Sequence, residues 1–180
     1  ARQGLITTRS GIGSFVTYDN VTLDSDLGWT LALAKGGVQL TTKTLTLKRG
    51  RCAASSRFLE VKNDFLCIDR VRLDNSTQKG LSYERSRLPW HTSYSHIIDE
   101  GLVEDSLNKT LIAQGITVTS GEEWAEVLCR LPTDTAKRMK RGTNEPMLKL
   151  RRVTRSADNQ VVEFVDSVLD PAHFGLHLTF

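Results

Sequence analysis

The residues best suited to binding chemistry lie between positions 65 and 89. Arg70 and Arg72 are two apart, so on a strand their side chains point to the same face. Glu84 follows a polar, turn-like segment and would lie on the returning strand of a hairpin. Guanidinium groups bind phosphate or carboxylate through paired hydrogen bonds, and a glutamate accepts bonds from hydroxyl or amine groups. The pattern predicts a site for a small anion with a polar body; a solvated, salt-bridged strand face is the alternative.

Two helix starts could supply further donors to the same anion. Apolar spacing predicts a helix over 26–35, and if it opens near Trp29 its free N–H groups and the Thr30 hydroxyl form an anion cradle. A second helix is predicted over 104–114, with Ser106 in its first turn. The alternative is structural in both cases: Trp29 is a core residue, Thr30 an ordinary first-turn residue, and Ser106 an N-cap.

The first 18 residues predict a separate small hairpin. Two short apolar and β-branched segments flank a tip that contains Arg9, Gly11 and Gly13. A narrow two-stranded ribbon with an arginine at its tip and glycines that permit close backbone approach suits a nucleic-acid groove. An ordinary edge hairpin would show the same pattern.

Composition narrows the class of protein. The chain has 180 residues, 39% of them hydrophobic, which is enough for one compact domain with a buried core. The formal net charge of +3 is nearly balanced and does not by itself indicate a nucleic-acid partner. No signal peptide or long apolar run is visible, so we expect a cytoplasmic protein without a membrane role.

Cysteine and histidine give no sign of a metal or redox site. The three cysteines are far apart and odd in number, and we expect buried thiols in a reducing compartment: Cys52, Cys67 and Cys129. His91 and His96 are close, but no carboxylate or cysteine stands at ligand spacing. The sequence therefore predicts no metal and no cofactor. The aromatic, histidine-rich segment around this pair, 90–100, is predicted to be a loop or flap.

The elements that must position the candidate residues recur along the chain. A strand, a short helix and a hairpin ending near Glu84 are followed by a second strand, short helix and hairpin ending near Glu163. In this loose repeat Arg70 aligns with Arg152, and Glu84 aligns with Glu163. Neither half could bury a sheet face alone, so we expect an α+β fold with one antiparallel sheet and helices packed on it. The two glutamates would then approach a shared cavity.

Ordered motifs resemble a known family. The pattern G-L-I-x-T-R-x-G-x-G-S-F-V over 4–16 resembles the wing of the winged helix-turn-helix of GntR-type bacterial repressors. The remainder resembles the UTRA effector-binding domain of the HutC subfamily of GntR regulators, which shares its fold with chorismate lyase. Its cues follow in order: Ala54 and Leu59, Arg70 and Arg72, Glu84 with Leu88 and Pro89, Ser106 with Leu107 and Leu111, Gly115 with Ile116, then 146–153 and Val162 with Glu163.

The resemblance implies a domain organisation and a site. Residues 1–18 would be the C-terminal wing remnant of a DNA-binding domain whose helices are lost or outside this chain, 19–25 a linker, and 26–180 the UTRA domain. In amino-sugar-phosphate-sensing members the phosphate contacts fall on a set that corresponds here to Trp29, Thr30, Arg70, Arg72 and Ser106, and the sugar contacts on Glu84 and Glu163. The tyrosine expected six residues after the second glutamate is Leu169, and the following arginine is Asp170. This departure leaves a carboxylate effector, as in urocanate-sensing relatives, as an alternative to a sugar phosphate.

The function implied is a ligand-responsive bacterial transcriptional regulator, a repressor, in which a small anionic effector changes dimeric DNA binding. Operator DNA would be contacted through the winged helix-turn-helix, including Arg9, Gly11 and Gly13, and palindromic operators imply a homodimer. The alternative is a chorismate lyase-like enzyme acting on a small acid. The wing and the lack of a recognisable Ser-His-Asp or Cys-His set favour a protein that is not an enzyme.

Overall fold

The computed structural model describes residues 6–9, 13–18, 21–22 and 39–174. Near the N-terminus a small antiparallel sheet has the order β1-β2-β3, formed by β1 (Ile6–Arg9), β2 (Gly13–Tyr18) and β3 (Val21–Thr22). The predicted hairpin is confirmed, and Arg9 lies opposite Gly13 where it closes. The short β3 lies inside the segment expected to be a linker, 19–25, and pairs with β2.

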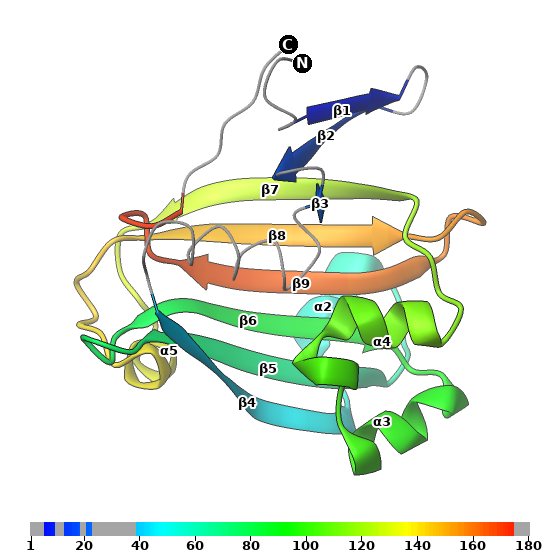
Figure 1. Cartoon of the computed structure of the whole chain (residues 1–180), viewed down its shortest axis with the longest axis horizontal. Helices are drawn as coiled ribbons and strands as arrows, with labels where there is room; N and C mark the ends of the chain where they lie inside the picture. The colour runs from blue at the N-terminus through cyan, green and yellow to red at the C-terminus, as the bar shows by residue number, and fades with distance from the viewer. Residues whose placement is uncertain (1–5, 10–12, 19–20, 23–38, 175–180) are drawn as a thin grey trace.

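The main body is a six-stranded antiparallel sheet (Figure 1). Its strand order is β4-β5-β6-β9-β8-β7. The strands are β4 (Leu40–Gly50), β5 (Phe65–Asp74), β6 (Gly80–Pro89), β7 (Ser120–Leu128), β8 (Met147–Arg155) and β9 (Val161–Leu169). Together with its helices this sheet confirms the expected α+β class.

The predicted two-fold repetition is visible in the order of the elements. The first half runs β4, α2 (Ala53–Leu59), β5, β6, and the second runs β7, α5 (Thr133–Met139), β8, β9. The halves join through β6 and β9, so equivalent strands lie at equal distances from the centre of the sheet. Joining the halves gives one continuous sheet whose faces can be buried, which neither half could achieve alone.

Helices cover both faces of the sheet (Figure 1). The α4 face carries Leu66, Ile68 and Leu88, and these pack against α3 (Ser95–Glu100) and α4 (Leu107–Ala113). The opposite α5 face carries Val71 and Val168, which pack in a cluster with Ala136 and Met139 of α5. Helix α2 lies on this second face as well, because its Phe58 ring is 4.9 Å from that of Phe164.

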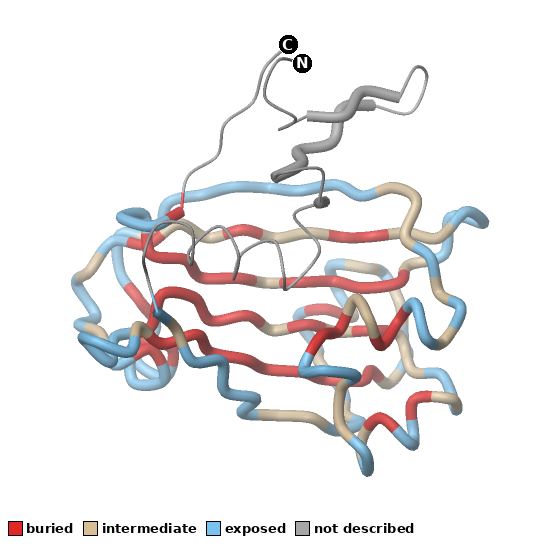
Figure 2. The backbone as a smooth tube through the Cα atoms, viewed as in Figure 1, coloured by how far each residue is buried: buried red, intermediate tan, exposed pale blue. Residues whose placement is uncertain are grey.

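Double coverage explains the burial of the central strands (Figure 2). Every residue from 65 to 73 is buried, although three of these side chains are charged. The polar members face a covered surface, and Arg70 and Arg72 are only 4% and 1% exposed. The alternative of a solvated, salt-bridged strand is thereby excluded.

The edge strand β7 is the contrasting case. All seven residues from Gly121 to Val127 are exposed, and Glu122, Glu123 and Glu126 lie among them. Figure 2 shows this strand as an exposed band along the sheet. Charged side chains on an edge strand oppose pairing with another sheet.

Three sequence-based expectations need correction. The segment 90–100 is not an irregular loop: η1 (Thr92–Tyr94) leads directly into α3, because Tyr94 and Ile97 are buried against the sheet. The first part of the helix predicted over 104–114 is η2 (Val103–Asp105), and α4 follows it separately. The cysteines are not uniformly buried, since Cys67 is buried, Cys52 intermediate and Cys129 exposed.

Candidate functional site

The register of β5 and β6 brings the predicted charged residues together on the α4 face. Arg70 pairs with Glu84 across the two strands, and Arg72 pairs with Ser82. Arg72 Nη1 lies 2.5 Å from Glu84 Oε2 and donates to Ser82 Oγ at 3.2 Å. Arg70 Nη2 lies 3.5 Å from the same carboxylate oxygen. Two guanidinium groups thus converge on one carboxylate.

Electrostatics keep this carboxylate ionised. Burial by itself would raise the pKa of Glu84, but the charges of Arg72 and Arg70 and the hydrogen bond from Arg72 outweigh it. Arg152 adds a smaller effect in the same direction, and the pKa of Glu84 falls to about 2. The cluster of Arg70, Arg72 and Glu84 therefore carries one net positive charge in a buried position.

Ser106 lies next to this cluster. It is the N-cap of α4, where Ser106 Oγ accepts a hydrogen bond from Lys109 N at 3.2 Å, so the structural role expected for it is present. Arg70 Nη1 donates to the main-chain oxygen of Asp105, one residue earlier, at 3.4 Å. A hydroxyl that accepts one bond can still donate its own hydrogen, so Ser106 retains the chemistry needed to bind an anion.

Glu163 occupies a different part of the same face. The β6–β9 register places Glu84 opposite Ser167, four residues along the strand from Glu163. Burial, and after it the Glu163 carboxylate, raises the pKa of Tyr94, which belongs to the apolar cluster under α3 and α4. Glu163 therefore neighbours Tyr94, whereas the cluster of Arg70, Arg72 and Glu84 lies further along the sheet.

A small hollow of about 10 Å³, room for about one water molecule, borders the arginine cluster. Glu84 forms part of its wall, and its other side chains come from β7, β8 and β9: Glu123, Leu150, Arg152, Val165, Ser167 and Leu169. Arg152 lies directly opposite Glu123 in the β7–β8 ladder. The internal repeat had aligned Arg152 with Arg70 and so offered a signal for it, whereas no sequence pattern pointed to Glu123 or Ser167.

The remaining predicted residues fall partly outside the described chain. Trp29, Thr30 and Gly11 lie outside the described residues, and only the backbone pairing of Arg9 and Gly13 is described. Within the described segments no set of three or more His, Cys, Asp or Glu residues is arranged to hold a metal ion. No helix in this part of the chain is long and apolar enough to span a membrane.

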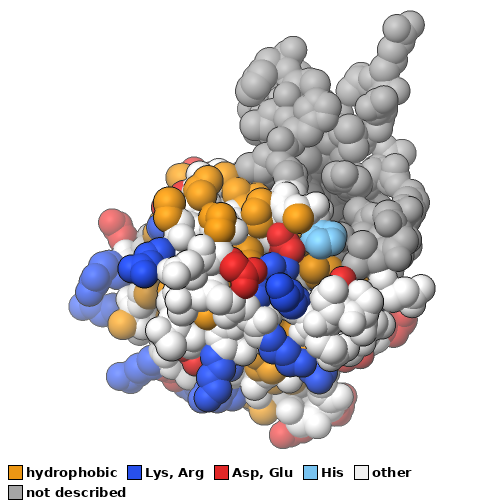
Figure 3. Space-filling view, turned by 90° about the vertical axis from the view of Figure 1, so that its left-hand side faces the viewer, with side chains coloured by type: hydrophobic (Ala, Val, Ile, Leu, Met, Phe, Trp, Pro, Cys, Tyr) orange, Lys and Arg blue, Asp and Glu red, His pale blue; other side chains and the backbone are white. Residues whose placement is uncertain are grey.

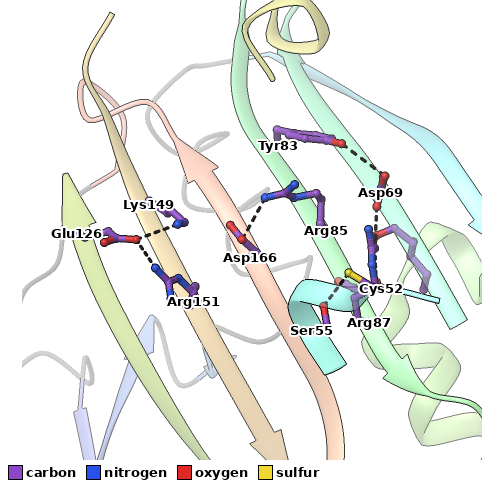
Figure 4. A network of polar contacts seen from close by, with 12 residues as sticks. Cys52, Ser55, Asp69, Tyr83, Arg85, Arg87, Glu126, Lys149, Arg151 and Asp166 are labelled. Atoms are coloured by element: carbon purple, nitrogen blue, oxygen red, sulfur yellow. Dashed lines mark hydrogen bonds and ion pairs between the residues drawn. The ribbon is translucent and has the colours of Figure 1, made fainter. Parts of the chain in front are cut away.

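The α5 face carries a second polar network that the sequence analysis missed (Figure 4). Arg87 binds Asp69 at 2.7 Å, and Arg85 binds Asp166 at 3.0 Å. Near the edge, Glu126 accepts bonds from Lys149 and Arg151. Each charge in these pairs meets an opposite charge across neighbouring strands, which accounts for the network as sheet stabilisation.

The basic run at the end of α5 also has local partners. Arg138 binds Asp134 at 2.7 Å, and Arg141 binds Glu145 at 2.9 Å. Figure 3 looks at this end of the molecule and shows Lys and Arg side chains separated by uncharged surface. The run does not form the continuous basic stripe typical of a nucleic-acid interface.

Comparison with known proteins identifies the family. The family model described as the UTRA domain matches residues 35–174. The chain therefore belongs to the UTRA-domain family. No curated protein sequence matches it.

Solved structures share the fold. PhnF from Mycobacterium smegmatis superimposes with a TM-score of 0.71 at 16% identity, covering 99% of this chain and 79% of that one. A GntR-family transcriptional regulator from Bacillus cereus gives 0.66 at 14% identity, covering 78% and 98%. The C-terminal domain of the histidine utilization repressor from Pseudomonas syringae pv. tomato gives 0.64 at 18% identity, covering 79% and 99%. These similarities confirm the antiparallel α+β architecture.

Proposed function

We propose that this chain is the effector-binding part of a ligand-responsive bacterial transcriptional regulator of the GntR type, HutC subfamily. The observation that carries the proposal is the buried convergence of Arg70, Arg72 and Glu84, with Ser106 beside them. Two buried guanidinium groups held on one face offer paired, charge-assisted hydrogen bonds to a phosphate or carboxylate. The small hollow beside Glu84 marks the direction in which the rest of the ligand would extend, and this hollow would have to widen to admit it.

The effector we propose is a small anionic metabolite, either a sugar phosphate or an organic acid. Its anionic group would bind Arg70, Arg72 and Ser106, with Trp29 and Thr30 as further proposed contacts. Glu84 and Glu163 would accept hydrogen bonds from its polar body. Leu169 lines the hollow with an aliphatic surface at the position where the family resemblance implies a tyrosine. For this reason the proposal includes an organic acid as well as a sugar phosphate.

Regulation would act through the N-terminal residues. The hairpin closed by Arg9 and Gly13 would be the wing of a winged helix-turn-helix, and a homodimer would read a palindromic operator. Effector binding must favour one of two dimer states over the other to change DNA affinity. We propose that the regulator represses transcription. A protein that shares this fold is named a histidine utilization repressor.

A ligand screen tests this proposal. Thermal shift with a panel of sugar phosphates and small organic acids, followed by calorimetry, should identify an anion that stabilises the chain. Its affinity should fall when Arg70 is replaced by alanine. If no anion binds, or binding does not depend on Arg70, the effector site is wrong. Turnover of chorismate by the purified chain would show instead that the protein is a lyase.

A further inference from the structure

The turn between α3 and α4 has an unfavourable backbone. Gly101, with φ of 87°, opens it, and Glu104 and Asp105 follow with φ of 49° and 55°. Residues with a Cβ avoid this left-handed region, and two in succession persist only where surrounding bonds hold them in place. The turn ends at Ser106.

One buried side chain ties the turn to α4. Thr110 is 2% exposed, and its Oγ1 donates to the main-chain oxygen of Ser106 at 2.7 Å. The same hydroxyl oxygen accepts a hydrogen bond from Val103 N at 2.9 Å. Because these two bonds join both ends of η2 to the helix, Thr110 fixes the turn at its beginning and at its end. An ion pair between Lys109 and Glu104 supports it from the solvent side.

The turn contacts the arginine cluster through its main chain. The main-chain oxygen of Asp105 accepts from Arg70 Nη1 at 3.4 Å, and Ser106 follows immediately. If the turn relaxed to right-handed backbone angles, this carbonyl and the Ser106 side chain would both change direction. The relative placement of Arg70 and Ser106 therefore depends on the turn being held.

We propose that Thr110 is a positioning residue of the anion site, holding the turn so that Ser106 faces the anion bound by Arg70. The inference rests on the proposed function in one respect, namely that Arg70 and Ser106 bind the anionic group. Thr110 acts through Ser106: its hydroxyl is buried, and its donor is already used. A relaxed turn would leave α4 packed on the sheet through Leu107 and Leu111 while removing one anion donor.

The test compares Thr110→Val, which keeps the shape and removes the hydroxyl, with Thr110→Ser, which keeps the hydroxyl. Inorganic phosphate and acetate, the head groups of the two effector classes, are titrated into the full chain and followed by NMR chemical shifts. Thr110→Val should bind the better probe about fivefold more weakly, as expected for one lost hydrogen bond. Thr110→Ser should bind as the wild type does. Thr135→Val is the matched control, because Thr135 is buried on the α5 face.

A double-mutant cycle separates positioning from a general loss of structure. In a Ser106→Ala background Thr110→Val should cause no further loss, because the hydroxyl that it positions is gone. Three outcomes would overturn the role of Thr110 and leave the anion site standing. They are unchanged affinity in Thr110→Val, weak binding by Thr110→Ser, and a full additional loss in the Ser106→Ala background. Arg70→Ala binding both probes as tightly as wild type, or no binding of either probe by wild type, overturns the anion site itself.

Discussion

Arg72 and Glu84 form a diagonal ion pair on the α4 face. Glu84 lies directly opposite Arg70 in the ladder, yet its 2.5 Å contact is with Arg72, and Arg70 stays 3.5 Å away. Arg72 is therefore the close counter-ion of Glu84, while Arg70 also reaches the main chain next to Ser106. The two arginines, which look equivalent in sequence, have different roles.

Replacing Arg72 should be costly for stability. Arg72→Met leaves the Glu84 carboxylate buried without its close partner, and loss of one member of a buried pair costs about 3–5 kcal/mol. The double variant Arg72→Met with Glu84→Gln removes the unpaired charge and should recover much of this loss. Urea denaturation measures both. Equal destabilisation of single and double variants would show that Arg72 contributes through packing rather than charge.

Stability should depend on Glu84 at acidic pH. Its pKa falls from an ordinary 4.5 to about 2 in the folded protein, so the stabilisation is fully present above about pH 4.5 and is lost as the pH falls towards 2. A shift of this size corresponds to about 3 kcal/mol. The difference in unfolding free energy between wild type and Glu84→Gln should therefore narrow over this range. If the unfolding free energies of wild type and Glu84→Gln differ by the same amount at every pH in this range, the lowered pKa of Glu84 is contradicted.

Arg70 should matter for binding. Arg70→Ala removes a charge-assisted contact and should weaken binding of the effector by about 1.5–3 kcal/mol. Arg85→Ala is the control: its partner Asp166 lies on the α5 face, and its side chain is 40% exposed. Calorimetry with the anion found in the screen compares them. Equal losses in both variants would point to non-specific charge attraction.

Local signals made the hairpins predictable, but not their burial. The last hairpin, β8 and β9, is marked in the sequence because a polar turn separates two apolar runs. Burial of Arg70 and Arg72 was not predictable, because it depends on how distant parts of the chain pack together and not on local spacing. Spacing alone placed the two arginines together. Glu123 joined the hollow only through the register of β7 with β8, which no local pattern encodes.

Helix α5 packs so closely on β6 that one glycine is required. A Cβ added to Gly80 would lie 2.8 Å from Met139 Cα, a main-chain atom that cannot move aside cheaply. Gly80→Ala should therefore destabilise the protein by about 1–3 kcal/mol, as overpacking usually does. Gly50→Ala is the matched control, since its nearest neighbour would be Cys67 Sγ at an ordinary 3.6 Å. Thermal denaturation should separate the two; similar melting temperatures would mean that α5 can shift.

The acidic edge strand β7 limits how two copies can associate. Edge-to-edge growth of the sheet along β7 would align the carboxylates of Glu122, Glu123 and Glu126 with those of a second molecule, and like charges facing each other across strands repel. Basic side chains of β8 pair with Glu126, and Arg152 lies opposite Glu123, so these charges are already matched within one sheet. A second copy of the chain is thus steered away from forming a continuous twelve-stranded sheet through this border.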